Sequence, residues 1–237
     1  MGQKSIDLCI SPALFHLYDP RGKAVVVVDI FRATTSICAA FDHGVKEIIP
    51  VAGFEEARQY GNKGYLIAAE RDGIKPDFAD FGNSPFNFMK QGLQEATIVY
   101  STTNGTKAIQ LAEPADEVVI ASFINLTAVA THLARSQRDV IIMCAGWKNR
   151  FSLEDTLFGG ALAEMLLKHH QFTTDCDATN AAIDIWDTAR KDLMAYKAKF
   201  AHTHRLKKLM LDDVVGFCLT PDQTRSVPLY SKGRITV

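Results

Sequence analysis

The pattern of hydrophobic and polar positions changes most sharply at residues 25–36, VVVVDIFRATTS. Four consecutive valines predict a strand that is buried on both faces of a parallel sheet. The polar residues that follow, Asp29, Arg32, Thr34 and Thr35, predict a loop leading into a helix. Ligands of open α/β sheets bind at the carboxyl ends of strands, so this stretch is a candidate site. The alternative is structural, because an Asp that closes a strand is often only a turn former or a cap.

The same order of strand, polar loop and helix recurs along the chain, with strands predicted near positions 25, 65, 97, 118 and 140. This spacing is typical of successive βα units. We also expect strands at 4–10 and 46–51, helices at 34–43 and 54–60, and a largely helical stretch at 177–211. One or two short strands are expected in the tail, residues 214–237. We therefore predict an α/β protein with three α/β/α layers and a largely parallel central sheet. Residues 1–237 are expected to form a single α/β domain, with a smaller C-terminal lobe from about residue 170 as the alternative.

Composition narrows the classes of function. The 237 residues are 47% hydrophobic and 22% charged, as in ordinary soluble globular proteins. A formal net charge of -1 gives no indication of a nucleic-acid partner, whereas small anionic substrates remain compatible with a locally positive pocket. The five cysteines are scattered and form no CxxC pair, which favours a reduced, cytoplasmic protein. No stretch approaches membrane-spanning length and the start lacks a signal-peptide pattern, so no membrane partner is expected.

Polar residues follow five of the predicted strands, and together they suit phosphoryl chemistry. Carboxylates can hold a hard metal ion, and Arg, Lys, hydroxyl and backbone N–H groups can bind an oxyanion. Hydrolysis of a phosphate ester needs both kinds of group, because charge must be neutralised before attack. The residues concerned are Asp29 with Arg32, Glu70 with Arg71, the loop 102–107, Ser122 with Asn125, and the segment 148–155.

The loop STTNGTK at 101–107 resembles a phosphate cradle in composition and precedes a predicted helix. It lacks the GxxxxGKS or GxxxxGKT spacing of a nucleotide-binding P-loop. The structural alternative is that Thr103 or Asn104 caps the helix and Gly105 makes a tight turn. A second helix start is predicted at FGNSP, with Ser84 as N-cap and Pro85 at the first helical position.

The segment CAGWKNRFSLED at 144–155 supports opposed interpretations. Cys144 and Arg150 have the spacing of cysteine-dependent phosphatases, in which a thiolate attacks phosphorus. The bulky Trp147 and a single glycine make a poor loop for wrapping an anion, so a packed, buried Cys144 is the better interpretation. Ser152 and Asp155 form a capping-box-like pattern, which leaves a direct site role for Glu154 or Asp155 open.

The basic run at 197–208, which contains His202, His204 and Arg205, predicts the solvated face of a helix.

Five segments in fixed order, DIFRATTS, AERDG, FGNSP, STTNGTKA and CAGWKNRFSLEDT, make the chain resemble the 2-phosphosulfolactate phosphatase family between residues 25 and 163. The resemblance implies a Mg²⁺-dependent phosphatase that converts 2-phosphosulfolactate to sulfolactate, a step toward coenzyme M. It places these residues in or beside the site: Asp29, Arg32, Thr34, Thr35, Glu70, Arg71, Asn83, Ser84, Thr102, Asn104, Gly105, Thr106, Arg150, Glu154 and Asp155.

Our hypothesis assigns roles within this set. Catalytic residues are Asp29, Arg32, Glu70, Arg71 and Asp155, and Mg²⁺ ligands are Asp29, Glu70, Asp155 and Glu154. Substrate-binding residues are Thr34, Thr35, Asn83, Ser84, Thr102, Asn104, Gly105, Thr106 and Arg150. Phe31 occupies the position of the second acid in phosphatases that form an aspartyl phosphate, which favours metal-bound water over Asp29 as the nucleophile. The alternatives are a phosphatase for another small phosphorylated acid and a non-catalytic binder of phosphorylated or sulfonated acids. The oligomeric state stays open, with a homodimer as one alternative.

Overall fold

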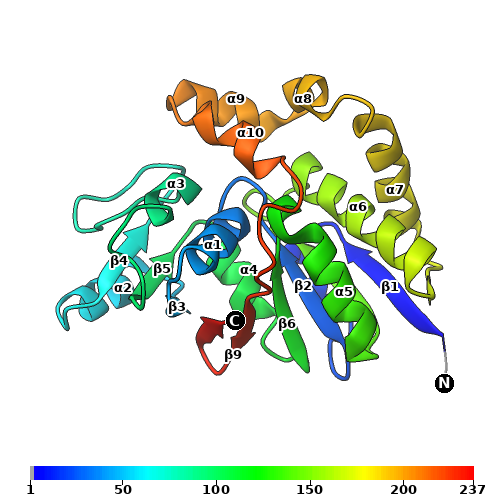
Figure 1. Ribbon diagram of the computed structural model, residues 1–237, viewed down its shortest axis with the longest axis horizontal. Coiled ribbons are helices and arrows are strands. Elements are labelled where there is room, and N and C mark those ends of the chain that lie inside the picture. Colours follow the sequence, from blue (N-terminus) through cyan, green and yellow to red (C-terminus); the bar gives the residue numbers. More distant parts are fainter. Residues whose placement is uncertain (1–2) are drawn as a thin grey trace.

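The computed structural model describes residues 3–237, which form one ten-stranded sheet with helices on both faces (Figure 1). The strands are β1 (Lys4–Cys9), β2 (Ala24–Val28), β3 (Glu47–Pro50), β4 (Leu66–Ala69), β5 (Thr97–Ser101), β6 (Glu117–Ala121), β7 (Val140–Cys144), β8 (Phe172–Thr173), β9 (Leu229–Ser231) and β10 (Arg234–Thr236). Their order across the sheet is β4-β5-β3-β10-β9-β6-β2-β7-β1-β8. The predicted three-layer α/β/α fold with a largely parallel sheet is confirmed.

The helices are α1 (Ala33–Asp42), α2 (Phe54–Gly61), α3 (Pro85–Phe88), α4 (Gly105–Leu111), α5 (Leu126–Ser136), α6 (Leu153–His169), α7 (Asp177–Ala189), α8 (Leu193–Tyr196), α9 (Ala201–Lys208) and α10 (Val215–Cys218). Short 3₁₀ helices are η1 (Pro12–Leu17), η2 (Phe123–Asn125), η3 (Lys197–Lys199) and η4 (Asp212–Val214). Around β2, helices α1 and α4 pack on one face of the sheet, and α5, α6 and α7 pack on the other. Helix α2 covers a smaller core beside β4 and β5.

Strand β2 has the double burial that its sequence predicts. All five of its residues are buried, and it pairs in parallel with β6 on one side and β7 on the other. Val25 and Val27 face the core beneath α1, whereas Val26 and Val28 face the core beneath α6. Because both faces are covered, the strand carries no polar positions until Asp29.

The C-terminal hairpin of β9 and β10 lies inside the sheet. Strand β10 pairs antiparallel with β3, and β9 pairs antiparallel with β6. The hairpin therefore joins two groups of parallel strands, β4-β5-β3 and β6-β2-β7-β1-β8. The expectation of one or two short strands in the tail is confirmed by β9 and β10, whereas residues 214–218 of the tail are helical, at the end of η4 and in α10.

The predicted helical stretch at 177–211 is confirmed as α7, α8, η3 and α9. Helix α7 packs along α6 and β1, and the chain then crosses the molecule above α1 as α8, α9 and α10 (Figure 1). Phe200, which precedes α9, packs edge-on against Phe31 in the loop after β2, with 5.7 Å between ring centres. The C-terminal helices therefore lie over the loop that follows the central strand.

Candidate functional site

Four buried carboxyl groups lie at the ends of β2 and β4 and at the start of α6. Asp29, Glu70, Glu154 and Asp155 are 7%, 5%, 3% and 2% exposed. Burial raises the pKa of Asp29 to about 7, and the charges of Glu70 and Glu154 add to this rise. Burial also raises the pKa of Asp155, with further contributions from Glu154 and Asp29. These carboxyl groups are thus close enough to repel one another, and we call them the acidic cluster.

Asp155 connects the loops after β2 and β7. Its Oδ1 accepts the backbone N–H of Ile30 at 2.9 Å, and its Oδ2 accepts that of Gly146 at 3.0 Å. Ser152 caps α6 through a 3.4 Å hydrogen bond from the N–H of Asp155. The capping prediction for Ser152 is therefore confirmed, while the Asp155 side chain holds two distant loops together.

The loop after β2 is held by its own hydroxyl groups. Thr34 Oγ1 accepts the N–H of Asp29 and donates to the Asp29 carbonyl, both at 3.0 Å. Thr35 Oγ1 donates to the carbonyl of Ile30 at 3.0 Å. Both threonines are fully buried. Their hydroxyls fix the backbone that carries Asp29, and a substrate-binding role for them stays a prediction.

Arg32 occupies the N-cap position of α1 and is 4% exposed. Its side chain lines a cavity of about 330 Å³ together with Asn83, Ser84 and Lys75. The structure thus brings Arg32 together with Asn83 and Ser84 of the FGNSP segment, which follow it in the sequence by 51 and 52 residues. Ser84 occupies the N-cap position of α3, with Pro85 at the first helical position, as predicted, but the Ser84 side chain makes no capping hydrogen bond.

Tyr100 and Ser36 hold Asn83 in this cavity, and neither was identified from the sequence. The hydroxyl of Tyr100 donates to Asn83 Oδ1, and Ser36 Oγ donates to the Asn83 carbonyl at 3.2 Å. Burial raises the pKa of Tyr100 well above its usual value, and the charge of Asp29 raises it further. Tyr100 lies within a buried strand, and no local pattern distinguishes it from a packing residue.

Glu70 ties the loop after β4 to the loop after β5. Its Oε1 accepts the N–H of Thr103 at 2.6 Å, and its Oε2 accepts that of Gly73 at 2.7 Å. Arg71 is held in the same scaffold. Its guanidinium donates to the carbonyls of Glu70 and Ala52 and to Ser101 Oγ, at 2.8, 2.8 and 3.0 Å. This geometry favours a supporting role for Arg71, and its catalytic role stays a prediction.

The loop at 102–106 is tightened by a reciprocal pair of threonines. Thr106 N donates to Thr102 Oγ1 at 3.1 Å, and Thr102 N donates to Thr106 Oγ1 at 3.2 Å. A Cβ atom at Gly105 would lie 2.5 Å from Ala33 Cβ and 2.9 Å from Asp29 Oδ2. Glycine is therefore required here, because it lets the start of α4 approach Asp29 directly.

The capping alternative for Thr103 and Asn104 is wrong. Asn104 occupies the N-cap position of α4 but makes no side-chain capping bond. Its Oδ1 instead accepts the N–H of Lys148 at 2.9 Å, and Thr103 bonds to Glu70. The Lys148 ammonium lies 2.7 Å from Asp72 Oδ1. The loops after β4, β5 and β7 therefore interlock beside the acidic cluster.

The geometry gives no support to a Cys144 nucleophile. Cys144 is fully buried, and burial together with Asp155 raises the pKa of its thiol well above the usual value. The loop after it folds as a tight turn, in which Trp147 and Arg150 exchange two 3.0 Å backbone hydrogen bonds. The N–H groups of Gly146 and Lys148 go to Asp155 and Asn104. Four loop N–H groups are thus already used and do not surround an anion.

Helix α9 places His202 against the acidic cluster. Its Nδ1 lies 3.0 Å from Glu154 Oε1, and the two side chains are 13% and 4% exposed. The Arg205 guanidinium stacks over Trp147 at 4.3 Å from a ring centre. The prediction of a solvated basic face is wrong for these two residues and correct for the exposed His204 and Lys207. Their burial depends on Trp147, more than 50 positions away, so local patterning carries no signal of it.

The acidic cluster offers oxygen donors, which are the ligands that Mg²⁺ prefers. Between residues 3 and 237, however, no three His, Cys, Asp or Glu side chains form a ready-made metal site. Carboxylate oxygens that accept one backbone N–H retain a further lone pair, so the donor chemistry still fits a hard cation. The Mg²⁺ requirement therefore stays a prediction.

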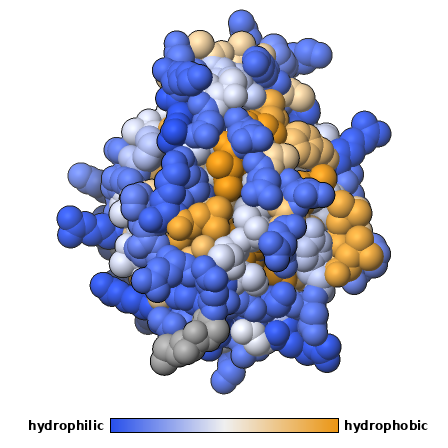
Figure 2. Space-filling model, turned by 90° about the vertical axis from the view of Figure 1, so that its right-hand side faces the viewer, coloured by the Kyte–Doolittle hydropathy of each residue, from blue (hydrophilic) through white to orange (hydrophobic). Residues whose placement is uncertain are grey.

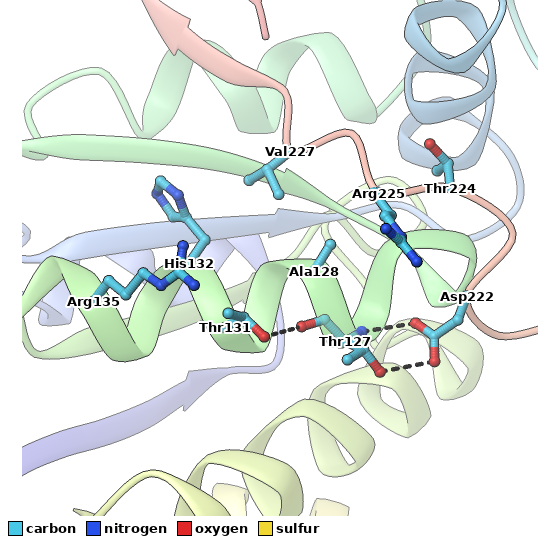
Figure 3. A pocket seen from close by; sticks show the side chains of 9 residues that line it. All are labelled: Thr127, Ala128, Thr131, His132, Arg135, Asp222, Thr224, Arg225 and Val227. Atoms are coloured by element: carbon cyan, nitrogen blue, oxygen red, sulfur yellow. Dashed lines mark hydrogen bonds between the residues drawn. The ribbon is translucent and has the colours of Figure 1, made fainter.

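A larger cavity, of about 810 Å³, lies elsewhere, between α5 and residues 222–227 (Figure 3). Its lining includes Thr127, Arg135 and Asp222 but no member of the acidic cluster. The Asp222 carboxylate accepts two 2.8 Å hydrogen bonds from Thr127, one from the N–H and one from the hydroxyl. Asn125, at the end of β6, likewise serves the fold, because it binds the Ser226 carbonyl at 3.0 Å. The strand end at 122–125 is thus not part of the candidate site.

On the side shown in Figure 2, hydrophobic residues occur in separate groups within a mainly hydrophilic surface. No helix among residues 3–237 is both long and apolar enough to cross a bilayer.

Comparison with known proteins identifies relatives along nearly the whole chain. A family model described as 2-phosphosulpholactate phosphatase matches residues 9–233. A probable 2-phosphosulfolactate phosphatase of Caldanaerobacter subterraneus subsp. tengcongensis is 34% identical over 219 residues, 91% of this chain and 90% of that protein. One of Thermotoga maritima is 36% identical over 211 residues, 89% of this chain and 90% of that protein. One of Clostridium novyi is 32% identical over 236 residues, 98% of this chain and 99% of that protein.

Proposed function

Because the chain belongs to the 2-phosphosulfolactate phosphatase family, a family of phosphoric monoester hydrolases, we propose that it hydrolyses 2-phosphosulfolactate to sulfolactate and inorganic phosphate. The observation that carries the proposal is the acidic cluster beside the buried Arg32. Four carboxyl groups from three segments of the chain are held at 7% exposure or less, and Asp29 among them has a pKa raised to about 7 by burial and Glu70. Carboxyl groups whose pKa is raised by burial and by neighbouring charges cluster at functional sites.

Arg32, Asn83 and Ser84 are proposed to bind the phosphoryl oxygens. They line one cavity, and the Asn83 side chain is fixed by Tyr100. A guanidinium forms charge-assisted hydrogen bonds with phosphate, often two at once. Arg32 would thereby neutralise charge on the phosphate and orient it toward Asp29.

Mg²⁺ is proposed to be held by carboxylate oxygens of Asp29, Glu70, Asp155 and Glu154, where it would supply further neutralisation of the phosphate charge. The mutual repulsion of these acids supports this assignment, since a cation would relieve it. Water is the proposed nucleophile, because Phe31 stands where a second acid would be needed for an aspartyl-phosphate route.

The direct test is release of inorganic phosphate from 2-phosphosulfolactate by the purified protein. We expect EDTA to abolish release and added Mg²⁺ to restore it. Asp29→Asn and Arg32→Ala should each lower kcat/KM by roughly 100-fold or more, as loss of a charge-stabilising group does in other enzymes. Glu55→Gln is the matched control, because Glu55 is an exposed acid in the first turn of α2.

The outcomes also separate the alternatives. Activity that survives chelation contradicts the Mg²⁺ assignment, whereas activity lost in Cys144→Ser at full stability would restore the thiolate route. Release from other small phosphorylated acids but not from 2-phosphosulfolactate would identify a different substrate. A protein that binds phosphosulfolactate but releases no phosphate under any metal condition would be a binder.

A place in coenzyme M formation and a cytoplasmic location complete the proposal. The substrate of the family supports the first. The second is supported by free thiols at Cys9, Cys38, Cys144, Cys176 and Cys218, since disulfides are rare in a reducing compartment.

A further inference from the structure

A second cavity, of about 280 Å³, lies between α9 and the segment from Trp147 to Glu154. Four of its lining residues are basic, namely Arg150, Lys199, His202 and Arg205, and Glu154 is the acidic one. The Glu154 carboxylate is paired with His202 at 3.0 Å. Of these four, only Arg150 belongs to the substrate-binding residues predicted from the sequence, and Lys199, His202 and Arg205 have no role in the proposed hydrolysis of the phosphate.

Arg205 is the most informative of them. Its guanidinium stacks on Trp147, which fixes the plane of the charged group. Its Nε is buried and, among residues 3–237, no hydrogen-bond partner accepts from it. A buried donor without an acceptor costs free energy, so such an atom points to an acceptor supplied by a ligand.

The cavity adjoins the acidic cluster. Glu154 lines the cavity and is close enough to Asp29 to raise the pKa of that residue. Phe31, the neighbour of Arg32, packs edge-on against His202 with 5.9 Å between ring centres. The cavity therefore borders the acidic cluster through Glu154 and its partner His202.

We propose that this cavity binds the sulfonate group of the substrate, an assignment that rests on the proposed function. A sulfonate has three oxygens that remain ionised at all physiological pH values, and Arg205, Arg150 and Lys199 together provide several donors for them. The planar fork of Arg205 suits an oxyanion, and its stacking on Trp147 prepares it before binding. The basic segment at 197–205 is then the part of the chain that selects sulfonated phosphoesters.

The test compares 2-phosphosulfolactate with 2-phospholactate, which lacks only the sulfonate group. We expect the wild-type protein to prefer the first compound. Arg205→Gln and Arg205→Lys should lower kcat/KM for 2-phosphosulfolactate by about 10- to 100-fold, mainly through KM, the loss expected for one charged hydrogen-bonding partner. The value for 2-phospholactate should change little. Lys207→Ala is the matched control, because Lys207 is an exposed base on the same helix.

If the Arg205 variants lose kcat/KM equally for both compounds, or for neither, the sulfonate assignment is overturned while the phosphatase function stays intact. Phosphate release from neither compound would overturn the proposed function instead. Calorimetric measurement of sulfolactate binding then tests the sulfonate assignment of the cavity independently of catalysis. Binding that is lost in Arg205→Gln and kept in Lys207→Ala supports the assignment, and no binding to the wild-type protein overturns it.

Discussion

Asp155 and Ile30 are joined by a 2.9 Å hydrogen bond between side-chain Oδ1 and backbone N–H across 125 positions of sequence. The same carboxylate holds Gly146 through its other oxygen at 3.0 Å. The hydrogen bond to Ile30 fixes the backbone immediately after Asp29. It thereby gives Asp155 a positioning role that is independent of any metal.

Asp155→Asn tests this role. One oxygen of the new amide can still accept an N–H, but its NH₂ group would face the second N–H. We expect a loss of about 1–3 kcal/mol in the free energy of unfolding, the usual cost of an unsatisfied buried group. Urea unfolding measures the loss, and phosphate release should fall with it. Asp77→Asn, at an exposed acid, should leave both unchanged. A stable Asp155→Asn protein with no activity would instead show that activity depends on Asp155 as the proposed Mg²⁺ ligand and not on its positioning of Ile30 and Gly146.

Gly105→Ala tests the contact between α4 and Asp29. The added methyl group would lie 2.5 Å from Ala33 Cβ and 2.9 Å from Asp29 Oδ2. We expect a loss of about 1–3 kcal/mol in unfolding free energy, as in other overpacked interiors, together with reduced kcat. Gly216→Ala is the control, because its nearest neighbour would be Met194 Cε at 3.9 Å. An unaltered kcat in Gly105→Ala would show that α4 can shift without disturbing the acidic cluster.

Arg71→Lys distinguishes a structural role of Arg71 from a catalytic one. The lysine cannot reproduce three hydrogen bonds to Glu70, Ala52 and Ser101, nor the stacking of Arg71 over Phe54 at 4.1 Å. We expect a loss of about 1–3 kcal/mol in unfolding free energy, while kcat/KM well below the melting temperature changes only severalfold. Arg58→Lys, at an exposed arginine over Phe78, should affect neither quantity strongly. A large loss of kcat/KM at unchanged stability would restore the catalytic assignment of Arg71.

The pair of Glu117 and His132 predicts a pH dependence of stability. A 2.9 Å hydrogen bond with His132 lowers the pKa of Glu117 below its usual value. The folded state therefore binds this proton more weakly than the unfolded state, whose pKa is about 4.3. The stabilisation is present above that value and is lost as the pH falls through the folded pKa.

Urea unfolding between about pH 5 and pH 3 checks this sign. The wild-type protein should lose more unfolding free energy over the interval than Glu117→Gln, which cannot titrate at this position. Equal losses would show that the hydrogen bond has no net effect on stability.

The parts of the fold that depend on local pattern could be predicted from the sequence. The run of valines in β2 and the polar residues after it carry their own signal, and the rule that strand ends meet at a sheet edge correctly grouped Asp29, Glu70 and Asp155. His202 and Tyr100 could not be found in this way, because their environment is set by Glu154 and Asn83 from distant segments. Arg71 shows that a sequence can also suggest a role that the structure does not favour. Its residue type suggested anion binding, but only the tertiary structure reveals that its donors are engaged.

The central place of β9 and β10 has a consequence for how the protein is made. Residues 229–236 are synthesised after every other strand, yet they lie between β3 and β6. Until the hairpin emerges from the ribosome, β3 and β6 each have an unpaired edge where the hairpin belongs. The two halves of the sheet can be joined only after the hairpin has left the exit tunnel, and the exposed edges of β3 and β6 are open to aggregation until then.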